Sequence, residues 1–309
     1  MALINSDLTG RVSAFLAGPG PSIDQRTGHG VVAQLHAQAL RAPHIVSDIA
    51  HLDSAANLDV PVLVVSRQSW SKVVADSFED LFGGVSEQNW LEAAALSTGL
   101  GASLAVMARS TLGQFLPFGG ESTDGGRGRL LLVAPNILAF QRTYGLDRRD
   151  LALWVSVHEL THAAQFAAAP WLEGFIVSRA RSLLQAQRDG EQIVLTDGAG
   201  GEVSAVMSLL EGHAEHVMNA VPIAQMPGKN RLIAAIGQRR SSGGALKRAI
   251  NRSMGLQAKL SQYSSGATFV AEVVKAVGYD GLNAVWESPL NAPSLEEIAA
   301  PQAWINRMR

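Results

Sequence analysis

The sequence contains no cysteine. A disulfide framework is therefore excluded, and a bound metal must be held by imidazole or carboxylate groups rather than by thiolates. Charged residues are also few, at 17% of the 309 residues, and the formal net charge is only −2. The basic stretch 239–252 is better explained as a solvated loop and helix start than as a nucleic-acid surface. We therefore expect no nucleic-acid partner.

Long apolar runs are missing as well. No stretch of 18 apolar residues occurs, and the N-terminal segment carries Asp7 in place of the basic-then-apolar pattern of a signal peptide. These features predict a soluble cytoplasmic protein with no membrane partner. With 47% hydrophobic residues the chain can bury a large core, and one domain over 1–309 is favoured. Nothing in the sequence specifies an oligomeric state.

The most informative segment is His158-Glu159-Leu160-Thr161-His162. On a helix this spacing places two imidazoles one turn apart, with a carboxylate beside the first. It is the His-Glu-x-x-His arrangement of zinc metallopeptidases, in which the histidines bind the metal and the glutamate transfers the proton. The alternative is a pair of core histidines, each satisfied by a hydrogen bond.

The residues around this motif follow a helical pattern. Asp147 can cap the first free amides, and apolar residues then recur at steps of three and four until Pro170, which cannot extend a helix. The pattern predicts a helix over about 147–169. His158 and His162 share its apolar face, as metal ligands from one helix must.

A catalytic zinc usually takes three protein ligands and a water. The metzincin continuation of the motif is excluded, because Gln165 and Ala168 stand where it requires Gly and His. A second helix, predicted over about 202–220, offers other candidates. Glu211 and His213 lie at the two borders of its buried face, each roughly 80° from the centre, so helix geometry does not separate them.

Other groups on this helix are candidates for supporting roles. Glu215 lies four residues after Glu211 and either orients a ligand imidazole through its second nitrogen or is a surface charge. His213, His216 or Tyr263 can supply a hydrogen-bond donor to a tetrahedral oxyanion. Gly212 either allows the second helix to approach the first closely or adds flexibility.

The segment Glu211-Gly212-His213-Ala214-Glu215 resembles the gluzincin pattern. In that pattern the first glutamate of the second helix is the third zinc ligand. The resemblance therefore implies Zn²⁺ bound by His158, His162 and Glu211, with Glu159 as the general base.

More closely, the chain resembles an uncharacterised bacterial family of zincin-like hydrolases, one branch of which is associated with genes for deazaflavin-coenzyme biosynthesis. The matching segments are 62–65, 131–136, the helix through His162, 210–219 and 281–289. The resemblance implies a zincin-like metallopeptidase core. Together with the sequence pattern it indicates an α+β fold that is predominantly α-helical, with a small β-sheet.

The remaining sequence adds a few elements. Apolar runs predict strands over 60–66 and 129–133. Helical spacing predicts helices over 6–16, 30–52 with an interruption near Pro43, 70–82, 90–108, 245–263 and 268–277, and a capping box at Ser294 starts a further short helix before Pro301. The strand over 129–133 would line an extended substrate if it formed the edge of the sheet. Gly119 to Gly128 forms either an ordinary loop or a flap over the cleft.

The sequence therefore predicts a zinc hydrolase that cleaves an amide bond, most simply a peptidase. Two other functions stay open at this point. One is a catalytically silent zincin fold used for binding or assembly, against which the intact Glu159 argues. The other is a small-molecule amidase in coenzyme metabolism.

Overall fold

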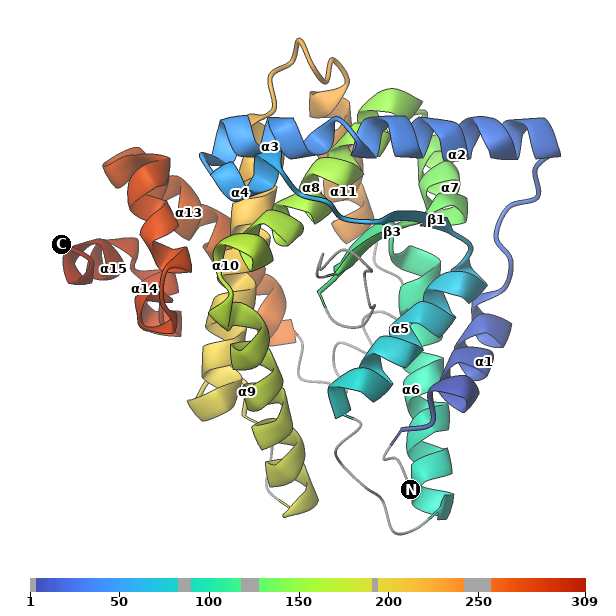
Figure 1. Cartoon of the computed structure of the whole chain (residues 1–309), viewed down its shortest axis with the longest axis horizontal. Coiled ribbons are helices and arrows are strands. Elements are labelled where there is room, and N and C mark those ends of the chain that lie inside the picture. The colour runs from blue at the N-terminus through green and yellow to red at the C-terminus, as the bar shows by residue number, and fades with distance from the viewer. Residues whose placement is uncertain (1–3, 83–89, 118–127, 191–193, 242–256) are drawn as a thin grey trace. The chain divides into compact units, whose positions relative to one another are not determined.

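The computed structural model describes residues 4–82, 90–117, 128–190, 194–241 and 257–309 (Figure 1). The fold is α+β and predominantly helical, as predicted. The elements are α1 (Ser6–Ala17), α2 (Gln25–Ala39), α3 (Ala42–Ala50), α4 (Asp53–Ala56), β1 (Val62–Val65), α5 (Arg67–Phe82), α6 (Trp90–Ser110), β2 (Gly113–Leu116), β3 (Arg129–Val133), α7 (Ala134–Tyr144), α8 (Arg148–Ala168), α9 (Trp171–Arg188), α10 (Gly198–Ala220), α11 (Lys229–Ser241), α13 (Gln257–Asn283), the 3₁₀ turns η1 (Ala284–Trp286) and η2 (Pro289–Asn291), α14 (Leu295–Ala299) and α15 (Pro301–Arg307).

The contacts divide the chain into two compact units. The first comprises Met1–Ala42 and Leu58–Ala163, and the second comprises Pro43–Asn57 and Ala164–Arg309. Helix α8 is continuous across this boundary, so its first turns belong to the first unit and its last turn to the second. The single domain over 1–309 stays a prediction.

The first unit contains a three-stranded sheet, counted within the described residues, of order β1-β3-β2. Strand β3 is parallel to β1 and antiparallel to β2. Its residues Leu130 to Val133 are completely buried. The strand that the sequence predicts over 129–133 is therefore the centre of this sheet and not an edge. The edge on that side is β2, which the sequence analysis did not predict.

Helices cover this sheet in the first unit. Helix α1 packs against α5 and α6. Apolar side chains of these helices form one core with the sheet, and its buried members are Ala17, Trp70, Val74, Ala75, Leu104, Ala105, Ala108, Leu116, Leu131 and Val133. This core holds β2 and β3 in place, and β2 contacts α8, because Gly113 lies against Val155 and Glu159.

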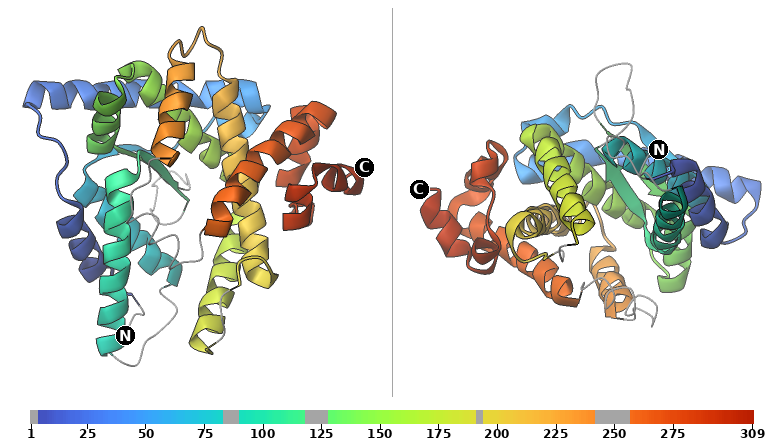
Figure 2. Two further views of the ribbon diagram at one scale, coloured as in Figure 1. Left: turned by 180° about the vertical axis from the view of Figure 1, so that it is seen from behind. Right: turned by 90° about the horizontal axis from the view of Figure 1, so that it is seen from below.

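In the second unit, α10 packs against α13 and α9 (Figure 2). The α10–α13 crossing is very close, because a Cβ added at Gly212 would overlap the backbone of Gly266, and one added at Gly266 would overlap the carbonyl of Ser208. The absence of a side chain at Gly212 therefore allows α13 to pack closely against α10. The close approach shown at Gly212 is thus to α13, and the predicted approach to the first metal helix stays a prediction.

The start of α10 also differs from the prediction. The sequence predicts this helix from about residue 202, but the glycines at 198–201 make its first turn, which the Asp197 side chain caps. A Cβ at Gly200 would overlap the carbonyl of Val194, so the glycine permits the chain to fold back closely at this point. Gly200 is therefore needed for space, whereas Gly198 has a left-handed backbone with φ 50°.

Several shorter predictions can be compared directly. The capping box of Ser294 and the start of α15 at Pro301 are confirmed. Of the tract Gly119 to Gly128, only Gly128 lies within the described residues, so the loop and flap interpretations both stay predictions. No helix in the part of the chain that the structure describes is long and apolar enough to span a membrane.

Candidate metal centre

Helix α8 begins as its sequence predicts. The Asp147 carboxylate accepts hydrogen bonds from the backbone N–H groups of Arg149 and Asp150, at 2.8 and 3.0 Å. These bonds satisfy two of the free amides of the first turn and fix where the helix starts. The helix then runs through His158 and His162 to Ala168. The predicted range of about 147–169 agrees with this element.

The two histidines of α8 have the geometry of a shared ion. Their Nε2 atoms are 3.3 Å apart, and the rings are nearly perpendicular. Two nitrogens bound to one tetrahedral zinc at the usual Zn–N distance would lie about 3.3 Å apart. Both side chains are partly exposed, so they are not the fully buried core histidines of the alternative interpretation.

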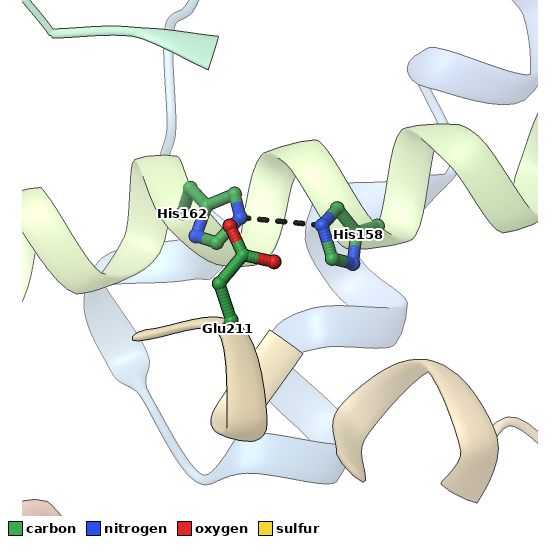
Figure 3. A group of neighbouring side chains, drawn as sticks. All are labelled: His158, His162 and Glu211. Atoms are coloured by element: carbon green, nitrogen blue, oxygen red, sulfur yellow. Dashed lines mark hydrogen bonds between the residues drawn. The ribbon is translucent and has the colours of Figure 1, made fainter. Parts of the chain in front are cut away.

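Glu211 completes a group of three possible ligands (Figure 3). Its carboxylate, from α10, points toward the imidazoles of His158 and His162, and one ligand atom from each residue lies within 4.8 Å of the other two. All three side chains are partly buried. Within the described residues no other cluster of three His, Cys, Asp or Glu has this proximity.

The donor set fits a catalytic zinc ion. Two imidazoles and one carboxylate are a ligand combination of catalytic zinc sites, which leave a fourth position for water. The partial exposure of the three side chains is consistent with access for water and substrate. The chemistry of the donors and the Nε2 spacing thus agree with the ion that the motif predicts.

Glu159 is held against the edge strand β2. Its side chain is 9% exposed, and its Oε2 atom accepts a hydrogen bond of 2.9 Å from the backbone N–H of Phe115. Gly113 makes the approach possible, because a Cβ there would lie 2.7 Å from the Glu159 Cγ atom and equally close to Val155. Neither contact could be predicted from the sequence, because strand β2 was not predicted.

His213 has a different environment from Glu211. It is completely buried, its Nδ1 atom lies 3.0 Å from the amide nitrogen of Gln165, and its ring packs against Trp286 at a centroid distance of 5.4 Å. The sequence left Glu211 and His213 as equal candidates. The group of possible ligands contains Glu211 and not His213.

His216 and Glu215 lie further along α10 and are partly buried. The His216 ring packs against Tyr279 at 5.8 Å, and burial lowers the pKa of His216. Burial also raises the pKa of Tyr279 to about 12. The supporting roles of Glu215, His213 and His216 stay predictions. The side chain of Tyr263 lies outside the described residues.

Comparison with known proteins agrees with the site. The family model of zincin-like metallopeptidases matches residues 4–197 and 196–305. A crystal structure from Chloroflexus aurantiacus, presented as that of a candidate hydrolase with a novel fold, shares 30% sequence identity, with a TM-score of 0.74 over 99% of this chain and 98% of that one. A search of the curated proteins found no match.

The association with deazaflavin-coenzyme genes stays a prediction. The family match, in contrast, extends over nearly the whole chain and includes the His-Glu-x-x-His helix and the helix of Glu211. This chain belongs to the zincin-like metallopeptidase family.

Proposed function

We propose that this protein is a zinc-dependent hydrolase that cleaves an amide bond, and that its substrate is a peptide. His158, His162 and Glu211 would hold the ion. The observation that carries the proposal is their proximity, with ligand atoms within 4.8 Å of one another and Glu159 adjacent in sequence to the first of them.

Zinc bound at this position would polarise a substrate carbonyl and make water more acidic. The protein must then receive the proton of the attacking water and deliver it to the leaving amine. Glu159 is suited to this task, because one of its oxygens is engaged by the Phe115 N–H and its side chain is shielded from bulk water. The fixed hydrogen bond limits rotation of the carboxylate, which keeps it oriented for both transfers.

The first test is the metal content of purified protein, measured by mass spectrometry for wild type, His162→Ala, Glu211→Ala and Glu159→Gln. We expect about one zinc per chain in wild type and in Glu159→Gln, and a large loss in the two ligand variants. Zinc retained at full occupancy in Glu211→Ala would remove Glu211 from the ligand set. Absence of zinc from wild type after incubation with the ion would overturn the proposal.

The second test is turnover of a mixed peptide library, followed by mass spectrometry of the products. Glu159→Gln should lower kcat by roughly 100- to 10,000-fold while zinc stays bound, because the amide cannot accept the proton. Unchanged turnover in this variant would exclude Glu159 as the base. A zinc-loaded wild type that cleaves small amides and no peptide would correct the substrate class to that of an amidase.

A further inference from the structure

The third ligand comes from a different helix from the two histidines, so its position depends on how α10 is held beside α8. A metal site tolerates errors of only about 0.5 Å in the placement of its ligands. One contact between these helices lies within the second unit and close to Glu211. It is made by Gln165, which the proposed mechanism does not use.

Gln165 lies on the same face of α8 as the two histidines. It is seven residues after His158 and three after His162, which is helical spacing for one face. The side chain is completely buried. A buried amide must make its hydrogen bonds within the protein, so the partners of Gln165 show what it does there.

The amide nitrogen of Gln165 bonds to α10 at two points. It donates to the carbonyl oxygen of Leu210 at 2.9 Å and lies 3.0 Å from the Nδ1 atom of His213. A carbonyl oxygen can only accept, which fixes the orientation of the amide, and the NH₂ group has one proton for each partner. His213 therefore accepts at Nδ1 and carries its proton on Nε2.

These two partners flank Glu211 in the sequence, one residue before it and two residues after it. Bonds to both sides of this helical turn hold it against the last turn of α8, within the second unit. The same turn is held by other neighbours, because Gly212 lies against the backbone of Gly266 and the His213 ring packs on Trp286. The turn that carries Glu211 is thus secured against both α8 and α13.

We infer that Gln165 is the positioning residue for Glu211 as third metal ligand. The inference rests on the proposed zinc site. Gln165 acts through the Leu210 carbonyl and the His213 ring, which its amide nitrogen contacts. His213, held between Gln165 and Trp286, belongs to this packing, whereas the ligand atoms of Glu211 lie near those of the two histidines.

The test replaces Gln165 by Met, which retains length without the amide, and by Asn, whose amide is one methylene too short. Zinc affinity is measured by competition with a chromophoric chelator, and Co²⁺ absorption reports the coordination geometry. We expect 10- to 100-fold weaker zinc binding in both variants, as for other outer partners of metal ligands, and an altered cobalt spectrum. The matched control is Gln141→Met, which removes a comparable bond of 2.9 Å to the Leu146 carbonyl in the first unit and should leave zinc affinity unchanged.

A double-mutant cycle with Glu211→Ala separates positioning from general destabilisation. If Gln165 acts through Glu211, its replacement should have little further effect on the residual zinc affinity once Glu211 is absent. Affinity and cobalt spectrum like those of wild type in both Gln165 variants would overturn the inference while leaving the zinc site intact. Failure of wild type itself to bind zinc would instead overturn the proposed function, and the inference with it.

Discussion

At the scale of single residues, the approach of Glu159 to the sheet depends on the absence of one side chain. Gly113 lies where any Cβ would meet the Cγ atom of Glu159 and a methyl group of Val155. The glycine is needed here for space rather than for backbone conformation. The proposed general base and the edge strand are therefore in contact through a single position.

Gly113→Ala should displace Glu159 without removing a metal ligand. We expect a loss of about 1–3 kcal/mol in the free energy of unfolding, typical of overpacking, and at least a tenfold fall in kcat/KM at unchanged zinc content. Denaturant unfolding, metal analysis and kinetics on the same preparations give the three values. Gly99→Ala on α6, where an added Cβ meets nothing within 4 Å, is the matched control and should be neutral or slightly stabilising.

His216 should make stability depend on pH. Burial lowers its pKa in the folded protein below the value of about 6.5 in the unfolded chain. As pH falls through 6.5, the unfolded state gains the proton first, so the folded state loses stability below that pH. His216→Gln should reduce the decline in the free energy of unfolding between about pH 7.5 and 5.5, measured by urea denaturation.

The exposed His29→Gln on α2 serves as the control for that comparison. If wild type and His216→Gln lose stability in parallel as the pH falls, other groups are responsible for the acid sensitivity.

Some residues of the candidate site could be predicted from the sequence, whereas the third ligand could not. His158, Glu159 and His162 could be identified because their chemistry and spacing lie within five consecutive residues. The choice between Glu211 and His213 could not be made, because it depends on the surroundings of each side chain: Glu211 lies near the two histidines, whereas His213 is buried against Trp286. Helical periodicity describes one helix and contains no information on which neighbour faces it.

At the scale of elements, long and strongly patterned helices could be predicted and short or adjoining ones could not. Helix α8 was predicted within a residue or so at each end, whereas α7 and α9 were not predicted. Pro170 was interpreted only as the end of α8, but it also stands at the N-cap of α9. Strand β2 has four residues, too few to show an alternation of apolar and polar side chains. Its strand conformation depends on its antiparallel pairing with β3 rather than on a pattern in its own sequence.

The crossing of α10 and α13 should be sensitive to one methyl group. In Gly266→Ala the new Cβ would meet the backbone of Ser208, which cannot move as a flexible side chain can. We expect the helices to separate, at a cost of roughly 3 kcal/mol or more in the free energy of unfolding, and zinc affinity to fall because Glu211 lies on the same stretch of α10. Thermal unfolding and the chelator competition measure the two effects.

Gly237→Ala on α11 is the control for the crossing. It is an exposed helical glycine with nothing within 4 Å of the added Cβ, so the same substitution should stabilise the helix by about 0.5–1 kcal/mol. Equal melting temperatures for Gly266→Ala and wild type would show that α10 and α13 leave room for a methyl group at their crossing.

At the scale of the whole molecule, zinc binding should be visible as thermal stability. The ligands come from two helices that are far apart in the sequence, so the unfolded chain offers no comparable site. Zinc at 100 times its Kd should therefore stabilise the protein by about 2.7 kcal/mol. Scanning calorimetry should show a lower melting temperature after chelation and recovery on adding zinc.

Glu211→Ala tests whether that stabilisation arises at the described site. Its melting temperature should respond little to chelator or to zinc, because a ligand of the group is missing. An undiminished zinc-dependent shift in this variant would place the stabilising ion elsewhere in the molecule.

The hydrogen bond from Phe115 to Glu159 has a consequence for how this protein can change over generations. The donor is a main-chain amide, so every amino acid except proline preserves it. Substitutions at position 115 therefore keep the donor to the proposed base, whereas at Gly113 any added Cβ would overlap Glu159 and Val155. Two positions of one short strand thus differ in evolvability: replacements at 115 are limited by packing but keep the hydrogen bond to Glu159, whereas replacements at 113 change the placement of Glu159 itself.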